Sequence, residues 1–214
     1  MRFLEQIKKA VDRAPSFSLS NFFKDNYKGK IRGDVFITLQ DAVTGEVQER
    51  REIRNLIVTD CSVMVARLLK DPAEPWHGFY ALAVGTGDVG WDPMAPPAAT
   101  VTQRSLYSEI CRKTFTVTQF IDGAGVPTAI PTNVVDYTCT YVASEAVGPL
   151  VEMGVVCGNL SNNMSKRNSI LPPNGPYDPT VNQTSFESIG NYLCFPVINK
   201  PATSNLTIVW RITT

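Results

Sequence analysis

The closing segment of this chain alternates apolar and polar side chains in a way that is typical of a half-buried β-strand. Its apolar positions are Leu206, Ile208, Trp210 and Ile212. Thr207 and Arg211 stand between them. Because a period of two sends alternate side chains to opposite faces of a strand, we expect one face of this segment to lie in the core. An earlier strand that begins near Tyr192 is expected to precede it, with a polar break at 199–201 between the two.

Other segments repeat this alternation and predict an all-β protein. Residues 34–40 and 46–54 flank a DAVTG turn, so we expect them to pair as a hairpin. Charged and polar residues on one face of the second arm indicate that this face borders solvent. Further strands are predicted at 79–84, 113–121, 134–142 and 150–156. Many short strands, few helices and turns rich in proline and glycine favour an antiparallel β-sandwich with one or two short helices.

Three segments between the predicted strands are expected to form a helix, a turn and a long loop. A helix is predicted from Thr59-Asp60, which can cap it, to about Lys70. Its expected buried stripe is Cys61, Val65, Leu68 and Leu69. Gly85-Thr86-Gly87 is interpreted as a turn at the end of a strand, because it lacks the lysine and the spacing of a phosphate-binding loop. Residues 158–190, rich in Asn, Ser, Pro and Gly, are expected to form a long loop that is functional or mobile.

The chain is expected to divide into an N-terminal helical and extended arm at 1–30 and a β-sandwich domain at 31–214. Residues 1–14 have helical periodicity, and so short a helix is marginal in water unless it packs against something. Packing on its own domain and reaching to a neighbouring subunit are both open. The predicted subunit-interface residues of the arm are Phe3, Leu4, Ile7, Val11, Phe17, Phe22, Phe23 and Tyr27.

Composition and charge argue against several classes of protein. Apolar residues make up 43% of the chain and charged residues 19%, so we expect a packed core rather than disorder. The formal net charge of +0 gives no long-range attraction to nucleic acid. No apolar run approaches the roughly 20 residues of a membrane-spanning helix. The charges scattered through MRFLEQIKKAVDRAP are unlike a signal peptide, so synthesis in a cytoplasm is expected.

The cysteines do not predict a metal site. They are Cys61, Cys111, Cys139, Cys157 and Cys194. Because there is no CxxC pair and only one histidine, a Cys/His zinc set cannot be completed. We expect small buried apolar residues, while disulfides between subunits of an extracellular particle stay open because an odd count leaves one thiol over.

No motif in the sequence predicts catalysis or a bound cofactor. His77, the only histidine, is expected in a loop, and no serine lies in a G-x-S-x-G elbow. Asp88 and Asp92 do not have EF-hand spacing and are expected to be solvated. Glu109 and Glu152 lie beside predicted strands and are expected to be structural. Aromatic residues near loops could stack on sugars, although packing is the stronger expectation. These aromatic residues are Trp76, Tyr80, Trp91 and Tyr177.

A succession of short segments resembles a domain of phage tail-fibre, collar and baseplate proteins. In order, the segments are NLIV at 55–58, ARLL at 66–69, ALAVGTG at 81–87, LYSEICRK at 106–113, VEMGVV at 151–156, FPVINK at 195–200 and the strand at 207–213. The resemblance covers about 53–214, and the helix and hairpin before it and the 158–190 segment depart from the family's pattern. It implies a non-enzymatic virion part that assembles as a trimer, hexamer or ring.

We therefore expect a structural component of a phage tail, baseplate, neck or fibre attachment, made in the host cytoplasm and resident in the virion. The sandwich would be a rigid body, and the arm would dock on a neighbouring virion protein. A head-decoration protein or host-glycan-binding module is the alternative, with loops 72–78, 88–99 and 158–190 carrying recognition. A hydrolase of cell-wall or capsule sugar is a third hypothesis. No cofactor, nucleic-acid partner or membrane span is expected.

Overall fold

The computed structural model describes residues 31–71, 73, 76–159 and 187–214, and their strands fall into two groups. The first group is β1 (Arg32–Asp41), β2 (Val47–Arg54), β6 (Val117–Ile121), β7 (Pro127–Thr128), β8 (Val134–Tyr141) and β11 (Ser204–Thr213). The second group is β3 (Leu56–Ile57), β4 (Trp76–Gly85), β5 (Glu109–Thr114), β9 (Gly148–Asn159) and β10 (Glu187–Lys200). One helix, α3 (Thr59–Lys70), is described. The predicted N-terminal helical arm lies outside these residues.

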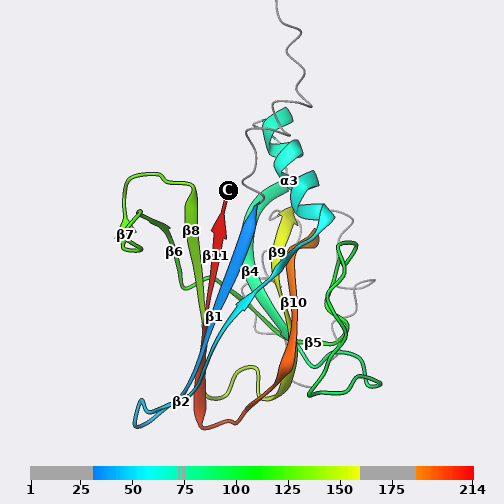
Figure 1. Ribbon diagram of the computed structural model, residues 1–214, viewed down its shortest axis with the longest axis vertical. Coiled ribbons are helices and arrows are strands. Elements are labelled where there is room, and N and C mark those ends of the chain that lie inside the picture. The colour runs from blue at the N-terminus through cyan, green and yellow to red at the C-terminus, as the bar shows by residue number, and fades with distance from the viewer. Residues whose placement is uncertain (1–30, 72, 74–75, 160–186) are drawn as a thin grey trace, which may run out of the picture. The chain divides into compact units, whose positions relative to one another are not determined.

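Each group of strands forms one antiparallel sheet, and the two sheets pack together as a β-sandwich (Figure 1). The strand orders are β2-β1-β11-β8-β6-β7 and β3-β10-β9-β4-β5. The predicted all-β sandwich is therefore confirmed. No helix in the described part of the chain has the length and apolar character of a membrane span.

The closing strand β11 lies at the centre of the first sheet, between β1 and β8. Trp210 pairs with Val35 on one side and Tyr137 on the other. Every second residue of β11 is buried, and Trp210 and Ile208 are both 0% exposed. The alternation predicted for this segment is confirmed. Because two strands pair with β11, the sheet cannot form without it.

The strands on either side of the last turn belong to different sheets, since β10 pairs with β9 and β11 with β1 and β8. The break predicted at 199–201 comes slightly later, because Lys200 is the last residue of β10 and is buried. Its Nζ donates hydrogen bonds to the carbonyl oxygens of Val142 at 3.0 Å and Ala143 at 3.1 Å. In the sequence, a lysine at the end of a strand is easily taken as part of a polar turn. In the structure, Lys200 is instead a buried residue at the end of β10.

The single strand predicted at 113–121 is wrong, because the chain changes sheets within it. Glu109–Thr114 forms β5 of one sheet and Val117–Ile121 forms β6 of the other. At the crossing, the amide of Thr116 donates to the carbonyl oxygen of Thr138 at 2.7 Å. The alternation of side chains continues through the corner, so periodicity alone gives no sign of it.

Two predicted loops also contain strand residues. Trp76 and His77, expected in a loop, begin β4. β9 runs to Asn159 and β10 begins at Glu187, so both ends of the predicted 158–190 loop are strand, and 160–186 lies outside the described residues. The hairpin at 34–40 and 46–54, by contrast, is confirmed by the pairing of β1 with β2. Gly45, with φ of 72°, takes the left-handed conformation that its turn requires.

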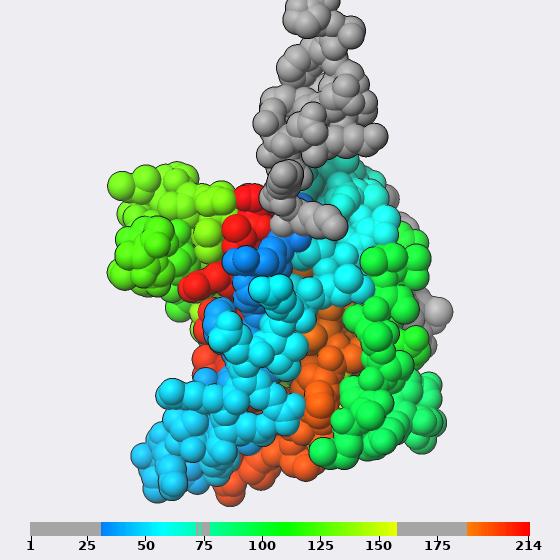
Figure 2. Space-filling model, in the orientation of Figure 1, coloured from blue at the N-terminus to red at the C-terminus, as the bar shows by residue number. Residues whose placement is uncertain are grey.

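The outer face of the second sheet is covered by the segment 86–108. Leu106 packs there with Ala81, Ala83, Val156 and Tyr192 in a cluster of buried residues. The amide of Val197 in β10 donates to the carbonyl oxygen of Pro93 at 2.8 Å. Figure 2 shows the green residues of this part of the chain lying against the orange strand β10. The second sheet is thus buried on both faces, which explains why residues 150–157 of β9 are all buried, whichever face their side chains are on.

Helix α3 has the predicted range but buries fewer side chains than predicted. Cys61 and Met64 are buried against Cys157, whereas Val65, Leu68 and Leu69 of the predicted stripe are exposed. The first turns of α3 pack on the sandwich and its later turns extend past the ends of the strands (Figure 1). The predicted capping by Thr59-Asp60 is also wrong, since Val58 is the N-cap residue and makes no side-chain cap hydrogen bond.

The central position of β11 gives a testable prediction. Replacing Trp210 by Ala should lower the free energy of unfolding by about 3–5 kcal/mol, because it leaves a large cavity in the core. Val209→Ala, on the partly exposed face of the same strand, is the matched control and should cost about 1 kcal/mol or less. Urea unfolding followed by circular dichroism measures both. Equal effects of the two substitutions would contradict the central role of this face.

Candidate functional site

The strongest candidate interaction surface is the exposed apolar part of α3. Val65, Leu68 and Leu69 are 36%, 41% and 82% exposed, respectively. Spaced by three and four residues, they lie on one side of the helix. We call these three residues the α3 apolar face. An amphipathic helix normally turns such residues to a core, so this face is suited to a partner.

The described chain begins close to the start of α3. The amide of Asn55 donates to the carbonyl oxygen of Gly33 at 3.1 Å, which ties the first residues of β1 to the segment before β3. From Asn55 the chain passes through β3 and Val58 directly into α3. The start of β1 therefore lies at the α3 end of the sandwich. The predicted interface residues of that arm, from Phe3 to Tyr27, lie outside the described residues, and their role stays a prediction.

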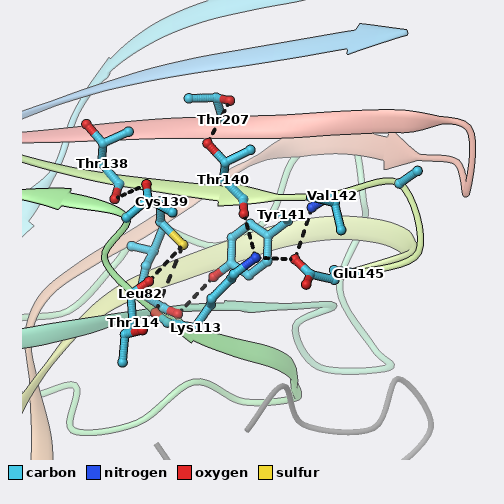
Figure 3. Close-up of polar contacts among 12 residues, drawn as sticks. Leu82, Lys113, Thr114, Thr138, Cys139, Thr140, Tyr141, Val142, Glu145 and Thr207 are labelled. Carbon is cyan, nitrogen blue, oxygen red and sulfur yellow. Dashed lines mark hydrogen bonds and ion pairs between the residues drawn. The ribbon is translucent and has the colours of Figure 1, made fainter. Parts of the chain in front are cut away.

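Below the surface, hydrogen bonds join the two sheets into one rigid body (Figure 3). The hydroxyl of Tyr141 in β8 donates to the carbonyl oxygen of Leu82 in β4 at 2.8 Å. Nζ of Lys113 in β5 donates to the carbonyl oxygen of Thr140 at 2.9 Å and to Oε2 of Glu145 at 2.7 Å. Burial lowers the pKa of Lys200, whose Nζ reaches the same turn between β8 and β9. These contacts fix the orientation of one sheet relative to the other.

Glu152 organises the segment that covers the second sheet. Its side chain is 0% exposed on β9. Oε1 accepts hydrogen bonds from the amides of Gly87 at 3.1 Å and Ser108 at 2.8 Å, and Oε2 accepts from the amide of Tyr107 at 3.0 Å and the hydroxyl of Tyr192 at 2.7 Å. One carboxylate thus joins both ends of the 86–108 segment to the sheet. Burial and the neighbouring carboxylate together raise the pKa of Tyr192 above its usual value.

The sequence places Glu152 beside a predicted strand, but it does not show which groups its carboxylate binds. Three of its partners are backbone amides from two segments that are far apart in the chain, and the fourth is the hydroxyl of Tyr192 in β10. The nearest sequence signal is Gly85, where a Cβ atom would lie 2.6 Å from Oε1 of Glu152. Glycine at that position leaves room for the carboxylate, and only the fold places the two residues side by side.

The other carboxylates singled out in the sequence are held by neighbouring groups. Glu109 is 1% exposed, and Arg112 donates to its two oxygens at 2.7 Å and 2.9 Å. Asp88 accepts from the amide of Gly90 at 2.8 Å and Asp92 from that of Met94 at 2.9 Å, each within its own turn. Among the residues that the structure describes, no three His, Cys, Asp or Glu side chains are grouped closely enough to hold a metal ion.

None of the five cysteines forms a disulfide, and four of them are buried, as expected from the sequence. Burial raises the pKa of Cys61 to about 11 and the pKa of Cys111 and Cys139 to about 12. Thiols that stay protonated and buried are poor partners for a disulfide between subunits. Cys194, which is only partly buried, is the most accessible thiol for such a bond.

Comparison with known proteins adds no family. No protein-family model matches this chain, and no curated protein has a significantly similar sequence. The resemblance to phage tail-fibre, collar and baseplate domains therefore stays a prediction from the sequence segments that carry it.

The role assigned to Glu152 can be tested by substitution. Glu152→Gln retains the shape of the side chain but leaves at least one buried amide without its acceptor, so the free energy of unfolding should fall by about 1–3 kcal/mol. The amides of Gly87, Tyr107 and Ser108 should also exchange hydrogen faster with solvent. Glu52→Gln, on the exposed face of β2, should change stability by about 0.5 kcal/mol or less. Unchanged protection of the three amides would refute this role.

Proposed function

We propose that this protein is a non-enzymatic structural component of a phage particle, in the tail, baseplate, neck or fibre attachment, that assembles with copies of itself and with other virion proteins. The observation that carries the assembly part is the α3 apolar face. The assignment to a phage particle rests on the sequence resemblance over about 53–214.

The α3 apolar face supports assembly for an energetic reason. Fully burying one leucine side chain contributes about 1.5–3 kcal/mol relative to leaving it in water. Leu69 is 82% exposed and Leu68 is 41% exposed, so most of that free energy is still available at Leu69 and part of it at Leu68. A neighbouring subunit that covered both residues would gain it on binding.

The occupant that we propose for this face is the N-terminal arm of a second copy. Phe3, Leu4, Ile7 and Val11 have the spacing of an amphipathic helix, which is the form of segment that lies against an apolar helix face. Gly33, at the start of β1, lies at the end of the sandwich near α3, as its contact with Asn55 indicates, and the arm is the segment that precedes β1 in the sequence. Copies arranged around a ring would each offer an arm to the next α3.

The mass of the full chain in solution, measured by light scattering over a range of concentrations, tests this proposal. We expect a discrete trimer, hexamer or larger ring. Leu69→Lys places a charge in the α3 apolar face and should shift the protein to monomer. Val43→Lys makes the same change at a turn position that is 93% exposed and should leave the mass unchanged.

Two results would contradict the proposal. One is a full-length chain that is monomeric at every concentration, and the other is an oligomer that Leu69→Lys does not weaken. A parallel run with reductant separates the role of the thiols, because an oligomer held through Cys194 would dissociate when the disulfide is reduced.

A further inference from the structure

A second candidate site lies at the other end of β4, where the chain leaves the strand at Gly85. The structure has a pocket of about 430 Å³ there, which falls in the size range of small-molecule sites. It is lined mainly by the turn after β4 and by the residues just before β5. The lining includes Thr86, Gly87, Asp88, Trp91, Tyr107 and Ser108.

Two aromatic rings meet in this pocket. Trp91 and Tyr107 have ring centroids 4.7 Å apart at an interplanar angle of 64°. The Trp91 ring lies directly on Gly87, where a Cβ atom would come within 2.4 Å of the ring. Gly87 also has φ of 70°, so it is the residue that permits both the turn and the close approach of the ring. Tyr107 is 55% exposed, so solvent reaches this residue from the pocket side or the surface.

Polar side chains also line the pocket, next to the rings of Trp91 and Tyr107. Asp88 is exposed, and the hydroxyl-bearing residues Thr86 and Ser108 are partly exposed. A carboxylate accepts hydrogen bonds, and a hydroxyl both donates and accepts them. A ligand that presents an apolar face to Tyr107 and hydroxyl groups to Asp88, Thr86 and Ser108 would match this lining.

The pocket is built on a fixed base. The amides of Gly87, Tyr107 and Ser108 all donate to the buried carboxylate of Glu152. The turn after β4, which contains Gly87, and the residues before β5, Tyr107 and Ser108, are therefore held at a set distance from each other before any ligand binds. Such preorganisation lowers the entropic cost of binding, which matters most for a small polar ligand that gains little from apolar burial.

We propose that this pocket binds a sugar unit of a carbohydrate, with its C–H face on Tyr107 and its hydroxyls on Asp88, Thr86 and Ser108. A pyranose has this combination of an apolar face and a rim of hydroxyls. The proposal extends the function beyond assembly, because it gives the rigid body a recognition site at the end of β4 opposite α3.

Saturation-transfer NMR of the full-length chain tests the proposal with a defined set of probes. These are glucose, galactose, N-acetylglucosamine, cellobiose, lactose and chitobiose, together with choline as a non-sugar probe for an aromatic and carboxylate site. We expect saturable binding of at least one sugar. Tyr107→Ala and Asp88→Asn should each weaken it at least ten-fold, whereas Tyr107→Phe should retain it because the ring remains.

Met94→Ala is the matched control, since Met94 is 67% exposed in the same loop but does not line the pocket. It should leave binding unchanged. The proposal is overturned if no probe sugar binds saturably, if only choline binds, or if Tyr107→Ala and Asp88→Asn leave sugar binding intact. The solution mass of each variant should equal that of the unmodified chain, so failure here is distinguishable from failure of the assembly proposal.

Discussion

The burial of β11 between β1 and β8 is the constraint on which the rest of this structure depends. The strand supplies Leu206, Ile208, Trp210 and Ile212 to the core and completes the pairing of β1, which would otherwise have only β2 beside it. β11 pairs with β1 and β8, both of which lie far away from it in the chain. The sheet therefore forms only when the whole sandwich assembles, and its folding is expected to be cooperative.

The two proposed surfaces lie at opposite ends of β4, and different contacts position them. At one end, Cys61 and Met64 anchor the first turns of α3 and leave Leu68 and Leu69 projecting. At the other end, Glu152 holds the segments that form the aromatic pocket. Between them, the hydrogen bonds of Tyr141 and Lys113 prevent the sheets from sliding. This arrangement supports the two proposals, in which one end of the rigid body serves assembly and the other end serves recognition.

Much of the fold could be predicted because the strands have a regular period. The alternation in 34–40 and 204–213 determines which residues are buried, since the side-chain period of a strand is fixed by its geometry. The corner at 115–116 could not be predicted, because the alternation continues through it. The exposure of Leu68 and Leu69 could not be predicted either, because periodicity defines the side of a helix and not where its support ends.

The aromatic pocket and the contacts of Glu152 could not be predicted from the sequence either, because each is formed by residues from different segments of the chain. In the sequence Trp91 is only an aromatic residue near a loop, whereas in the structure its contact with Tyr107 joins segments on either side of the 92–106 stretch. The four hydrogen bonds of Glu152 likewise link β9 to residues from three other segments. Sequence patterns describe neighbours along an element, whereas these sites are made of neighbours in space.

Photo-cross-linking from position 69 tests the central claim that α3 receives the arm of another copy. A benzophenone amino acid would replace Leu69 in an isotopically heavy chain, mixed and reassembled with unmodified light chains. The account predicts cross-linked peptides that join position 69 of a heavy chain to residues 1–30 of a light chain. Cross-links confined to heavy chains, or to light-chain segments other than 1–30, would contradict it.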